Sequence, residues 1–275
     1  MRFGYQTNTW GGVVGHPAGV TSIKDLYYLT YGSDEEALRD IAAAGYTGFE
    51  IFDGNLQRYA DDPPVLKGWM NETGLALIAV YSGANFVYPD VLDDEFARLE
   101  HAAQLGRQFG AQYHVVGGGA IRASGIRDSD FEALARGLNR FATLAARYGL
   151  QAMFHPHLGT IVQSPEQLDH LFRLTDIPLC PDTGHIIAGG GDPVQIIRTY
   201  RDRIPYVHFK DYANGRFLPL GEGELDVQGV IDALGDVSAD YWVTVELDET
   251  DKNPREEAEK SLNVLKKLAD TAAAS

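Results

Sequence analysis

Residues 130–157 read DFEALARGLNRFATLAARYGLQAMFHPH, and this stretch joins the two patterns from which the fold is inferred. Apolar residues recur at the helical period over Asp130–Tyr148, and Gly149 follows where a C-cap glycine is common. Ala152–His155 is then a short apolar run typical of a buried strand, and a second histidine, His157, follows two residues later. The stretch therefore predicts a helix, a tight turn and a strand with imidazoles at its carboxyl end.

Similar apolar runs alternate with amphipathic stretches over the whole chain. The expected strands are Phe3–Thr7, Gly48–Phe52, Ala76–Val80, Tyr113–Val116, Ala152–His155, Ile177–Pro181, Tyr206–Phe209 and Trp242–Glu246. Helices are expected after Ser33, over Asp94–Phe109, after Ser164-Pro165, over Val194–Tyr200 and over Glu256–Ala269. This alternation predicts an α/β fold, a single (β/α)8 TIM barrel, rather than an open doubly wound sheet. The lack of a GxGxxG after any strand also counts against a dinucleotide-binding fold.

The length of the chain fits one barrel. Such barrels take roughly 250 residues, so the 275 residues are expected to form one domain over residues 1–275. Residues 11–32 are too long for an ordinary connection between a strand and a helix. We expect them to form a lid over the barrel mouth.

Composition narrows the classes of protein further. Hydrophobic residues make up 44% and charged residues 23%, which is typical of a globular protein with a sizeable core. The net charge of −16 opposes binding to nucleic acid. No apolar stretch approaches the ~18 residues of a membrane span, and no signal-peptide pattern is found, so a cytoplasmic protein without a membrane partner is expected. Cys180 is the only cysteine, which excludes an intramolecular disulfide and counts against a thiolate metal cluster.

Ligand-type side chains stand at the carboxyl ends of four consecutive predicted strands. They are His155 and His157, Asp182 and His185, His208 and Lys210, and Glu246 and Asp248. Catalysis in TIM barrels takes place at this end, and residues two apart in a strand share a face. A lone histidine would fit an ordinary hydrogen-bonded core position, but four adjacent strands that all end this way favour one shared metal ion. The mixed donor set suits Mn²⁺, Co²⁺, Fe²⁺, Zn²⁺ or Mg²⁺.

Several of these segments carry a resemblance to a known family. Phe154–Gln163, FHPHLGTIVQ, resembles the segment YHHHMGTxVQ of the inosose (2-keto-myo-inositol) dehydratases. Asp182–His185 and Val207–Asp211 resemble the DTGH and VHxKD signatures of that family and of the wider xylose-isomerase-like sugar phosphate isomerase and epimerase superfamily. Thr7–Trp10 is similar to its N-terminal NW element, and Gly48–Glu50 is similar to its second-strand GxE.

The resemblance implies one divalent metal, with Mn²⁺ as the first choice. Its ligands would be Asp182, His208 and Glu246, with His155 of the fifth strand as the fourth. Isomerases and epimerases of the superfamily have a glutamate at that fourth position, so His155 departs from the paired-glutamate pattern. This departure favours a lyase that removes the proton α to a ketone and eliminates water, with the metal polarising the ketone.

Individual roles follow from residue type and position. His157, His185 and Glu246 are the expected acid–base groups, because imidazole and carboxylate can exchange protons with a substrate. His185 could instead orient Asp182 or contact a substrate hydroxyl. The expected substrate contacts are Trp10, Glu50, Lys210, Asp211 and Arg216. Glu50, Lys210 and Asp211 could instead support the ligands without touching the substrate, and Lys210 and Asp211 could form an internal ion pair.

The substrate is expected to be a small, uncharged keto-polyol or keto-sugar. Arg216 is one candidate anchor for a phosphate, but the loop that follows, over Leu220–Glu224, is acidic. An isomerase or epimerase acting through the same enolate, and a lyase that releases a glycoside from a 3-keto sugar, are the alternatives. A metal-dependent apurinic endonuclease shares the barrel but needs several metals and a surface that accepts DNA. A noncatalytic polyol-binding protein is a further class, and the resemblance implies a homo-oligomer.

Overall fold

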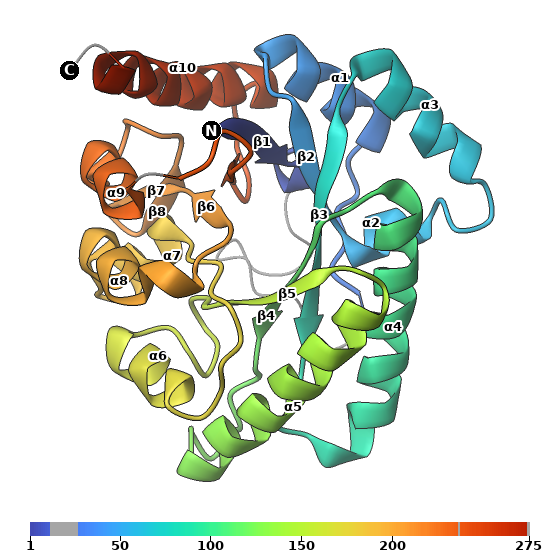
Figure 1. The fold of residues 1–275 in the computed structure, drawn as a ribbon, viewed down its shortest axis with the longest axis vertical. Helices are drawn as coiled ribbons and strands as arrows, with labels where there is room; N and C mark the ends of the chain where they lie inside the picture. The colour runs from blue at the N-terminus through green and yellow to red at the C-terminus, as the bar shows by residue number, and fades with distance from the viewer. Residues whose placement is uncertain (12–26, 236, 274–275) are drawn as a thin grey trace.

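Seven parallel strands form one curled sheet in the computed structural model, which describes residues 1–11, 27–235 and 237–273 (Figure 1). The order of the strands in the sheet is β5-β4-β3-β2-β1-β9-β6. Their bounds are β1 Arg2–Gln6, β2 Gly48–Phe52, β3 Ala76–Ala84, β4 Tyr113–Gly118, β5 Gln151–His155, β6 Val207–Phe209 and β9 Trp242–Val245. All neighbouring pairs are parallel, so their carboxyl ends meet at one mouth.

Residues 178–182 close the barrel between β5 and β6. One isolated bridge joins Leu179 to β5, and a second joins Asp182 to β6. The sequence predicted a regular strand over Ile177–Pro181, and that prediction is wrong in detail. Two residues of the segment are prolines, which have no amide N–H to donate to a ladder. The segment still occupies the sixth strand position of the barrel.

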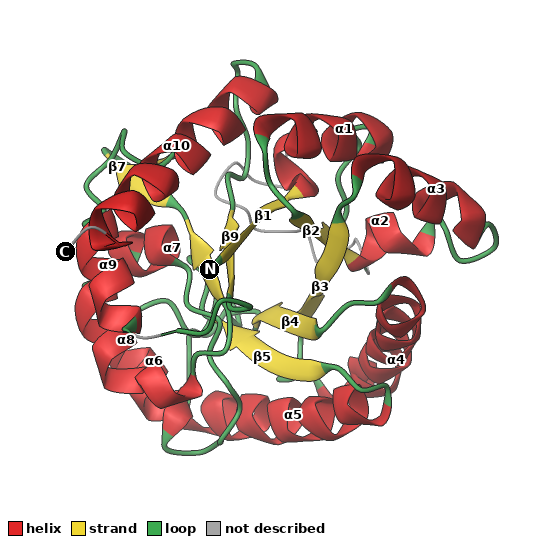
Figure 2. Ribbon diagram, turned by 45° about the horizontal axis from the view of Figure 1, so that its top comes forward, coloured by secondary structure: helices red, strands yellow, loops and turns green. Residues whose placement is uncertain are grey.

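Helices surround the strands as a ring, which confirms the predicted TIM barrel (Figure 2). Their bounds are α1 Asp34–Ala44, α2 Asp53–Gln57, α3 Pro63–Thr73, α4 Leu92–Phe109, α5 Asp128–Arg147, α6 Pro165–Phe172, α7 Thr183–Ala188, α8 Pro193–Tyr200, α9 Val227–Leu234 and α10 Pro254–Ala273. Ser33 caps α1 by accepting a hydrogen bond from the amide of Glu36 at 3.2 Å, and Gly110 ends α4 with a φ of 87°. None of these described helices has both the length and the apolar composition of a membrane span.

The inside of the barrel is a packed core rather than a pore. Its buried side chains include Ile78, Tyr81, Met153, Tyr206 and Trp242. Gly48 has to be a glycine here, because a Cβ at that position would lie 2.8 Å from both Ile78 and Trp242. The polar side chains at the carboxyl ends of the strands therefore lie above a packed apolar interior.

Two short strands that follow β6 were not predicted from the sequence. β7 Asp211–Ala213 and β8 Arg216–Leu218 form an antiparallel hairpin directly after β6. Its turn contains Asn214 and Gly215, with φ values of 52° and 77°, which suit the type I′ turn of a two-residue hairpin.

The predicted lid over residues 11–32 lies mostly outside the described residues, which omit 12–26. Its described end is attached to the carboxyl end of β2. The amide of Tyr28 donates to Asp53 at 3.0 Å, and the Tyr28 ring packs against Phe52 and Tyr81 with centroids 5.5 and 5.2 Å apart.

Candidate metal centre and active site

Four ligand-type side chains converge where the last strands of the barrel end. His155 ends β5, Asp182 is the N-cap of α7, His208 lies in β6 and Glu246 follows β9. One ligand atom from each lies within 4.8 Å of a ligand atom of every other. The three residues His155, Asp182 and His208 are fully buried, and Glu246 is 5% exposed. The structure therefore brings together the complete ligand set that the resemblance implied.

The unpartnered atoms of this cluster fit a divalent cation. Neither ring nitrogen of His155 has a hydrogen-bond partner among the described residues, and Oδ2 of Asp182 has only the ammonium of Lys210 at 3.4 Å. Oδ1 of Asp182 is occupied, because it accepts from the amide of His185 at 2.7 Å. A buried polar atom without a partner costs about 1–3 kcal/mol. Imidazole nitrogens and carboxylate oxygens that share one small space are the donors that a first-row divalent metal accepts.

His208 lies between two carboxylates. Its Nδ1 is 2.9 Å from Oε2 of Glu246, and its Nε2 is 3.1 Å from Oε2 of Glu50. When Nε2–H donates to Glu50, the imidazole is fixed in the tautomer whose Nδ1 is free to bind a cation. This is the arrangement of carboxylate, histidine and metal that is common in metal sites.

Glu50 is fully buried below His208 and has two further partners. Its Oε1 accepts from Nε2 of Gln6 at 3.2 Å, and its Oε2 accepts from the hydroxyl of Tyr206 at 2.8 Å. From the sequence, Glu50 was expected either to contact the substrate or to support a metal ligand. The structure directs this carboxylate at His208.

Lys210 places an ammonium group among the carboxylates of the site. Its Nζ is 3.1 Å from Asp248, 3.4 Å from Asp182 and 3.4 Å from Glu246. Burial alone would lower the pKa of Lys210, but Asp182, Asp248 and Glu246 outweigh it and raise that pKa above its ordinary value. Burial likewise raises the pKa of Glu246, yet Lys210 and His208 together bring it well below its usual range. Both groups are therefore charged at neutral pH.

Asp211 does not pair with Lys210. Its carboxylate is fully buried and accepts hydrogen bonds from four backbone amides at 2.9–3.0 Å. The donors belong to Tyr212, Gly221, Gly223 and Leu225. The carboxylate therefore ties the loop after β8 to β7, and the predicted substrate contact is a loop anchor in this structure.

His157 and His185 stack at the mouth with ring centroids 3.8 Å apart. Burial, with Lys210 nearby, lowers the pKa of His157 to about 4. Burial and the neighbouring His157 and Lys210 lower the pKa of His185 as well. Both imidazoles therefore favour the neutral form, because burial and the nearby ammonium disfavour the imidazolium.

The two neutral imidazoles have different partners. Nδ1 of His157 is 2.7 Å from the carbonyl of Leu158, so Nδ1–H donates there and Nε2 remains to accept a proton. Nε2 of His185 lies 3.3 Å from Nζ of Lys210 and accepts from the ammonium. Phe217 of the hairpin covers this pair, with its ring 4.7 Å from His185 and 4.9 Å from Nζ of Lys210.

The N-terminal strand contributes Asn8 rather than Trp10. Nδ2 of Asn8 donates to Glu246 at 3.1 Å and lies 3.4 Å from Asp248. The indole of Trp10 instead donates to Asp40 of α1 at 3.0 Å, outside the barrel. The short 3-10 helix η1 Thr7–Thr9 follows β1 and carries Asn8, and Trp10 is its C-cap.

Asp248 lies within the cluster, whereas Arg216 lies outside it. Asp248 was noted as sharing a face with Glu246 but was not assigned a role, and it is the nearest carboxylate to Lys210. Burial raises the pKa of Asp248 to about 6, although Lys210 opposes the shift. Arg216 lies exposed beside the hairpin turn, and the structure does not bring it to the cluster.

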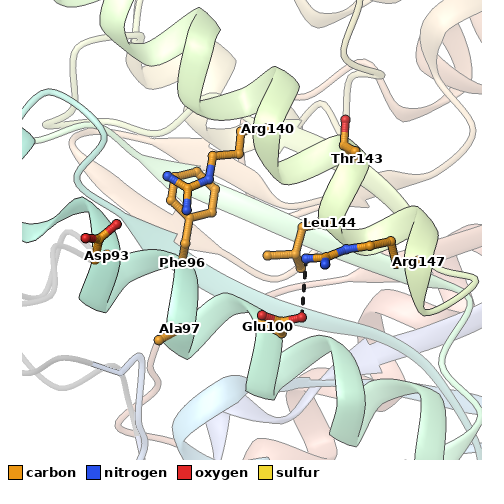
Figure 3. Close-up of a pocket in the computed structure, with 8 residues that line it drawn as sticks. All are labelled: Asp93, Phe96, Ala97, Glu100, Arg140, Thr143, Leu144 and Arg147. Carbon is orange, nitrogen blue, oxygen red and sulfur yellow. Dashed lines mark ion pairs between the residues drawn. The ribbon is translucent and has the colours of Figure 1, made fainter.

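A separate groove of about 480 Å³ lies between α4 and α5 on the outer layer of helices (Figure 3). The guanidinium of Arg140 stacks 3.7 Å over the ring of Phe96, and Arg147 forms an ion pair with Glu100 at 3.2 Å. None of the ligand-type residues of the barrel mouth lines this groove. Among the described residues, the buried groups that could hold a metal lie at the barrel mouth and not in this groove.

Comparison with known proteins agrees with the fold. Residues 38–268 match the family described as the xylose isomerase-like TIM barrel, and the chain belongs to that family. The predicted resemblance is thereby confirmed. An inosose dehydratase of Lacticaseibacillus casei is 30% identical over 267 residues, which cover 84% of this chain and 88% of that protein. An inosose dehydratase of Geobacillus kaustophilus is 29% identical over 252 residues, which cover 79% and 80%.

A solved structure supports the fold alone. The crystal structure described as the probable 3-DHS dehydratase AsbF from Bacillus anthracis matches this chain with a TM-score of 0.76 at 15% sequence identity. The match covers 97% of this chain and 99% of that chain.

Proposed function

We propose that this protein is a divalent-metal-dependent dehydratase that acts on a keto-inositol. It removes the proton α to the ketone and eliminates water. The observation that carries the proposal is the buried convergence of His155, Asp182, His208 and Glu246 beside a charged lysine and two neutral imidazoles. The relatives named inosose dehydratase, which align with most of this chain, support the same reaction.

We propose Mn²⁺ as the metal, with Co²⁺, Fe²⁺, Mg²⁺ and Zn²⁺ as the alternatives to test. His155, Asp182, His208 and Glu246 would hold it. When bound, such a cation polarises the ketone and stabilises the enolate. Glu50 keeps His208 in the tautomer that the ligand set requires.

The acid–base roles follow from the protonation states. His157 is neutral and has a free acceptor at Nε2, so we assign it the removal of the α proton. Lys210 and His185 share a hydrogen bond and can supply a proton to the departing hydroxyl. In the net step one C–H and one C–O bond break, a C=C bond forms and water leaves. The carboxylate of Glu246 remains ionised as a ligand and as a partner of Lys210.

The substrate is proposed to be small and uncharged. Asp182, Glu246 and Asp248 surround the ammonium of Lys210, and a further carboxylate, Glu50, lies against His208. A phosphate would be repelled by these carboxylates. We also propose that the enzyme works in the cytoplasm as a homo-oligomer, which light scattering of the purified protein would test.

The experiment starts from protein that a chelator has freed of metal. Each of the five ions is added back, and turnover of 2-keto-myo-inositol is followed by ultraviolet absorbance and by mass spectrometry. We expect Mn²⁺ to restore turnover, with a product that absorbs in the ultraviolet and has lost one water. A product of unchanged mass would identify an isomerase or epimerase. A 3-keto glycoside in a parallel assay tests release of the glycoside, and the absence of turnover with every ion would refute the proposal.

A further inference from the structure

Cys180 lies one layer below the carboxylate ligands inside the barrel. It precedes Asp182 by two residues on the closing segment, so the two side chains share the inner face. The thiol is fully buried and packs in the barrel interior with residues that include Met153 and Tyr206. The dehydratase chemistry proposed above makes no use of this sulfur.

The sulfur has two imidazoles within reach. A ligand atom from each of His155, Cys180 and His208 lies within 4.8 Å of the other two. His155 is fully buried, and neither of its nitrogens has a hydrogen-bond partner among the described residues. The orphaned imidazole is an observation independent of the cysteine, and it indicates that this space is built for a ligand.

We propose that His155, Cys180 and His208 form a second ligand set, which captures soft divalent cations such as Cd²⁺ through a thiolate. The inference rests on the proposed function, because two of its ligands belong to the metal centre described there. Thiolate sulfur selects softer metals, whereas carboxylate oxygen suits Mg²⁺ and Mn²⁺. Hard cations therefore use Asp182 and Glu246, and soft cations add Cys180.

Binding changes only protons and metal–ligand bonds. The S–H bond of Cys180 breaks, its proton passes to solvent, and the sulfur electron pair forms the bond to the metal. No oxidant or reductant takes part. Since the two sets share His155 and His208, a soft cation excludes the catalytic metal.

The test uses Cd²⁺ as the probe on the full-length, metal-free protein. Cadmium bound by a thiolate has a charge-transfer band in the ultraviolet, which is recorded as a difference spectrum. We expect the wild type to show this band, to release protons as cadmium binds, and to lose bound Mn²⁺ as seen by electron paramagnetic resonance. Since Cys180 is the only cysteine in the sequence, the band can come from no other thiol.

Two variants sharpen the test. Cys180→Ser should lose the band and bind Cd²⁺ at least about tenfold more weakly, because changes in outer partners alone cost about 10–100-fold in metal affinity. Met153→Leu changes the same interior layer without removing a ligand, and it should keep the band. Wild-type protein without the band, whether or not elemental analysis finds bound cadmium, would overturn the inference.

The same measurements separate this inference from the proposed function. The cadmium band requires no substrate, so it remains informative if 2-keto-myo-inositol is not turned over. Conversely, turnover with Mn²⁺ and no cadmium band would leave the dehydratase intact and remove only the second ligand set. If Cys180→Ser does not fold, the band and the proton release of the wild type still decide the question.

Discussion

Glu50 is a buried residue that we expect to strengthen metal binding through its contact with His208. Its carboxylate is fully buried, and three partners hold it: Gln6, Tyr206 and His208. A neutral amide at this position would orient the imidazole less firmly and make it a weaker ligand. We therefore expect Glu50→Gln to lower Mn²⁺ affinity by about 10–100-fold, measured by titration under electron paramagnetic resonance.

A matched variant isolates the effect of the charge. Tyr206→Phe removes one hydrogen-bond donor to Glu50 and leaves the carboxylate in place. It should weaken Mn²⁺ binding much less than Glu50→Gln does. Equal affinity in wild type and Glu50→Gln would show that Glu50 does not act through His208.

We expect the loss of Lys210 to destabilise the protein most when no metal is bound. Its ammonium is fully buried against Asp182, Glu246 and Asp248. Lys210→Met leaves these charges unpaired, and removing one partner of a buried ion pair costs about 3–5 kcal/mol. Added Mn²⁺ supplies positive charge to the same carboxylates, so the loss should shrink. Urea unfolding with chelator and with Mn²⁺ measures both quantities.

The control for this prediction is a lysine at the surface. Lys252 is 55% exposed and pairs with Glu222 and Glu257 at 3.6 and 3.9 Å. Ion pairs of exposed lysines contribute about 0–1 kcal/mol, and Lys260 still pairs with both glutamates, so Lys252→Met should change stability little. A similar loss for both variants, or no rescue by metal, would contradict the account of Lys210.

At the scale of elements, Asp211 connects β7 to the loop that follows the hairpin. Four backbone amides donate to its two oxygens, and an asparagine could accept at only one atom. We expect Asp211→Asn to destabilise the protein by about 1–3 kcal/mol, since buried amides lose their partners. Limited proteolysis should then cut within residues 219–226. Wild-type resistance there would show that the loop is held by other contacts.

The sequence predicts elements well where local chemistry decides them. Ser33, Gly110 and Pro165 mark helix ends that the structure reproduces, because caps and proline act within a few residues. The sixth strand was predicted from its apolar composition, although its prolines prevent a regular ladder. The hairpin around Asn214-Gly215 did carry a turn signal, which the analysis passed over.

The site was predictable as a set of strand ends but not as a set of contacts. Alternation along four strands placed the ligand-type side chains at one end of the barrel, because that rule is local. The family resemblance then implied His155, Asp182, His208 and Glu246 as the ligands. The partners Asn8 and Glu50 depend on how β1 and β2 are placed against β9 and β6 across the barrel. A register shift between β2 and β3 at Phe49/Glu50 and the 3-10 helix after β1 change these placements. No pattern within one strand encodes them.

At the scale of the whole molecule, burial of neutral histidines links stability to pH. His114 points outward from β4, where its ring packs against Phe141 of α5 and its Nε2 lies 2.9 Å from the hydroxyl of Ser82. Burial lowers the pKa of His114 to about 3, below the value of about 6.5 in unfolded chains. Between these values the unfolded chain binds a proton that the folded chain does not.

The sign of the effect follows directly from that difference. The contribution of neutral His114 to the free energy of unfolding is fully present above about pH 6.5. It falls as the pH drops toward 3, by up to about 1.4 kcal/mol per pH unit for one group. In His114→Gln the amide can still reach Ser82 but does not titrate, so its free energy of unfolding should fall less steeply between pH 7 and pH 5. Urea midpoints of the two proteins across this range give the comparison, and subtraction cancels the groups that both share. Parallel curves would mean that His114 gains no proton on unfolding and would contradict this account of its burial.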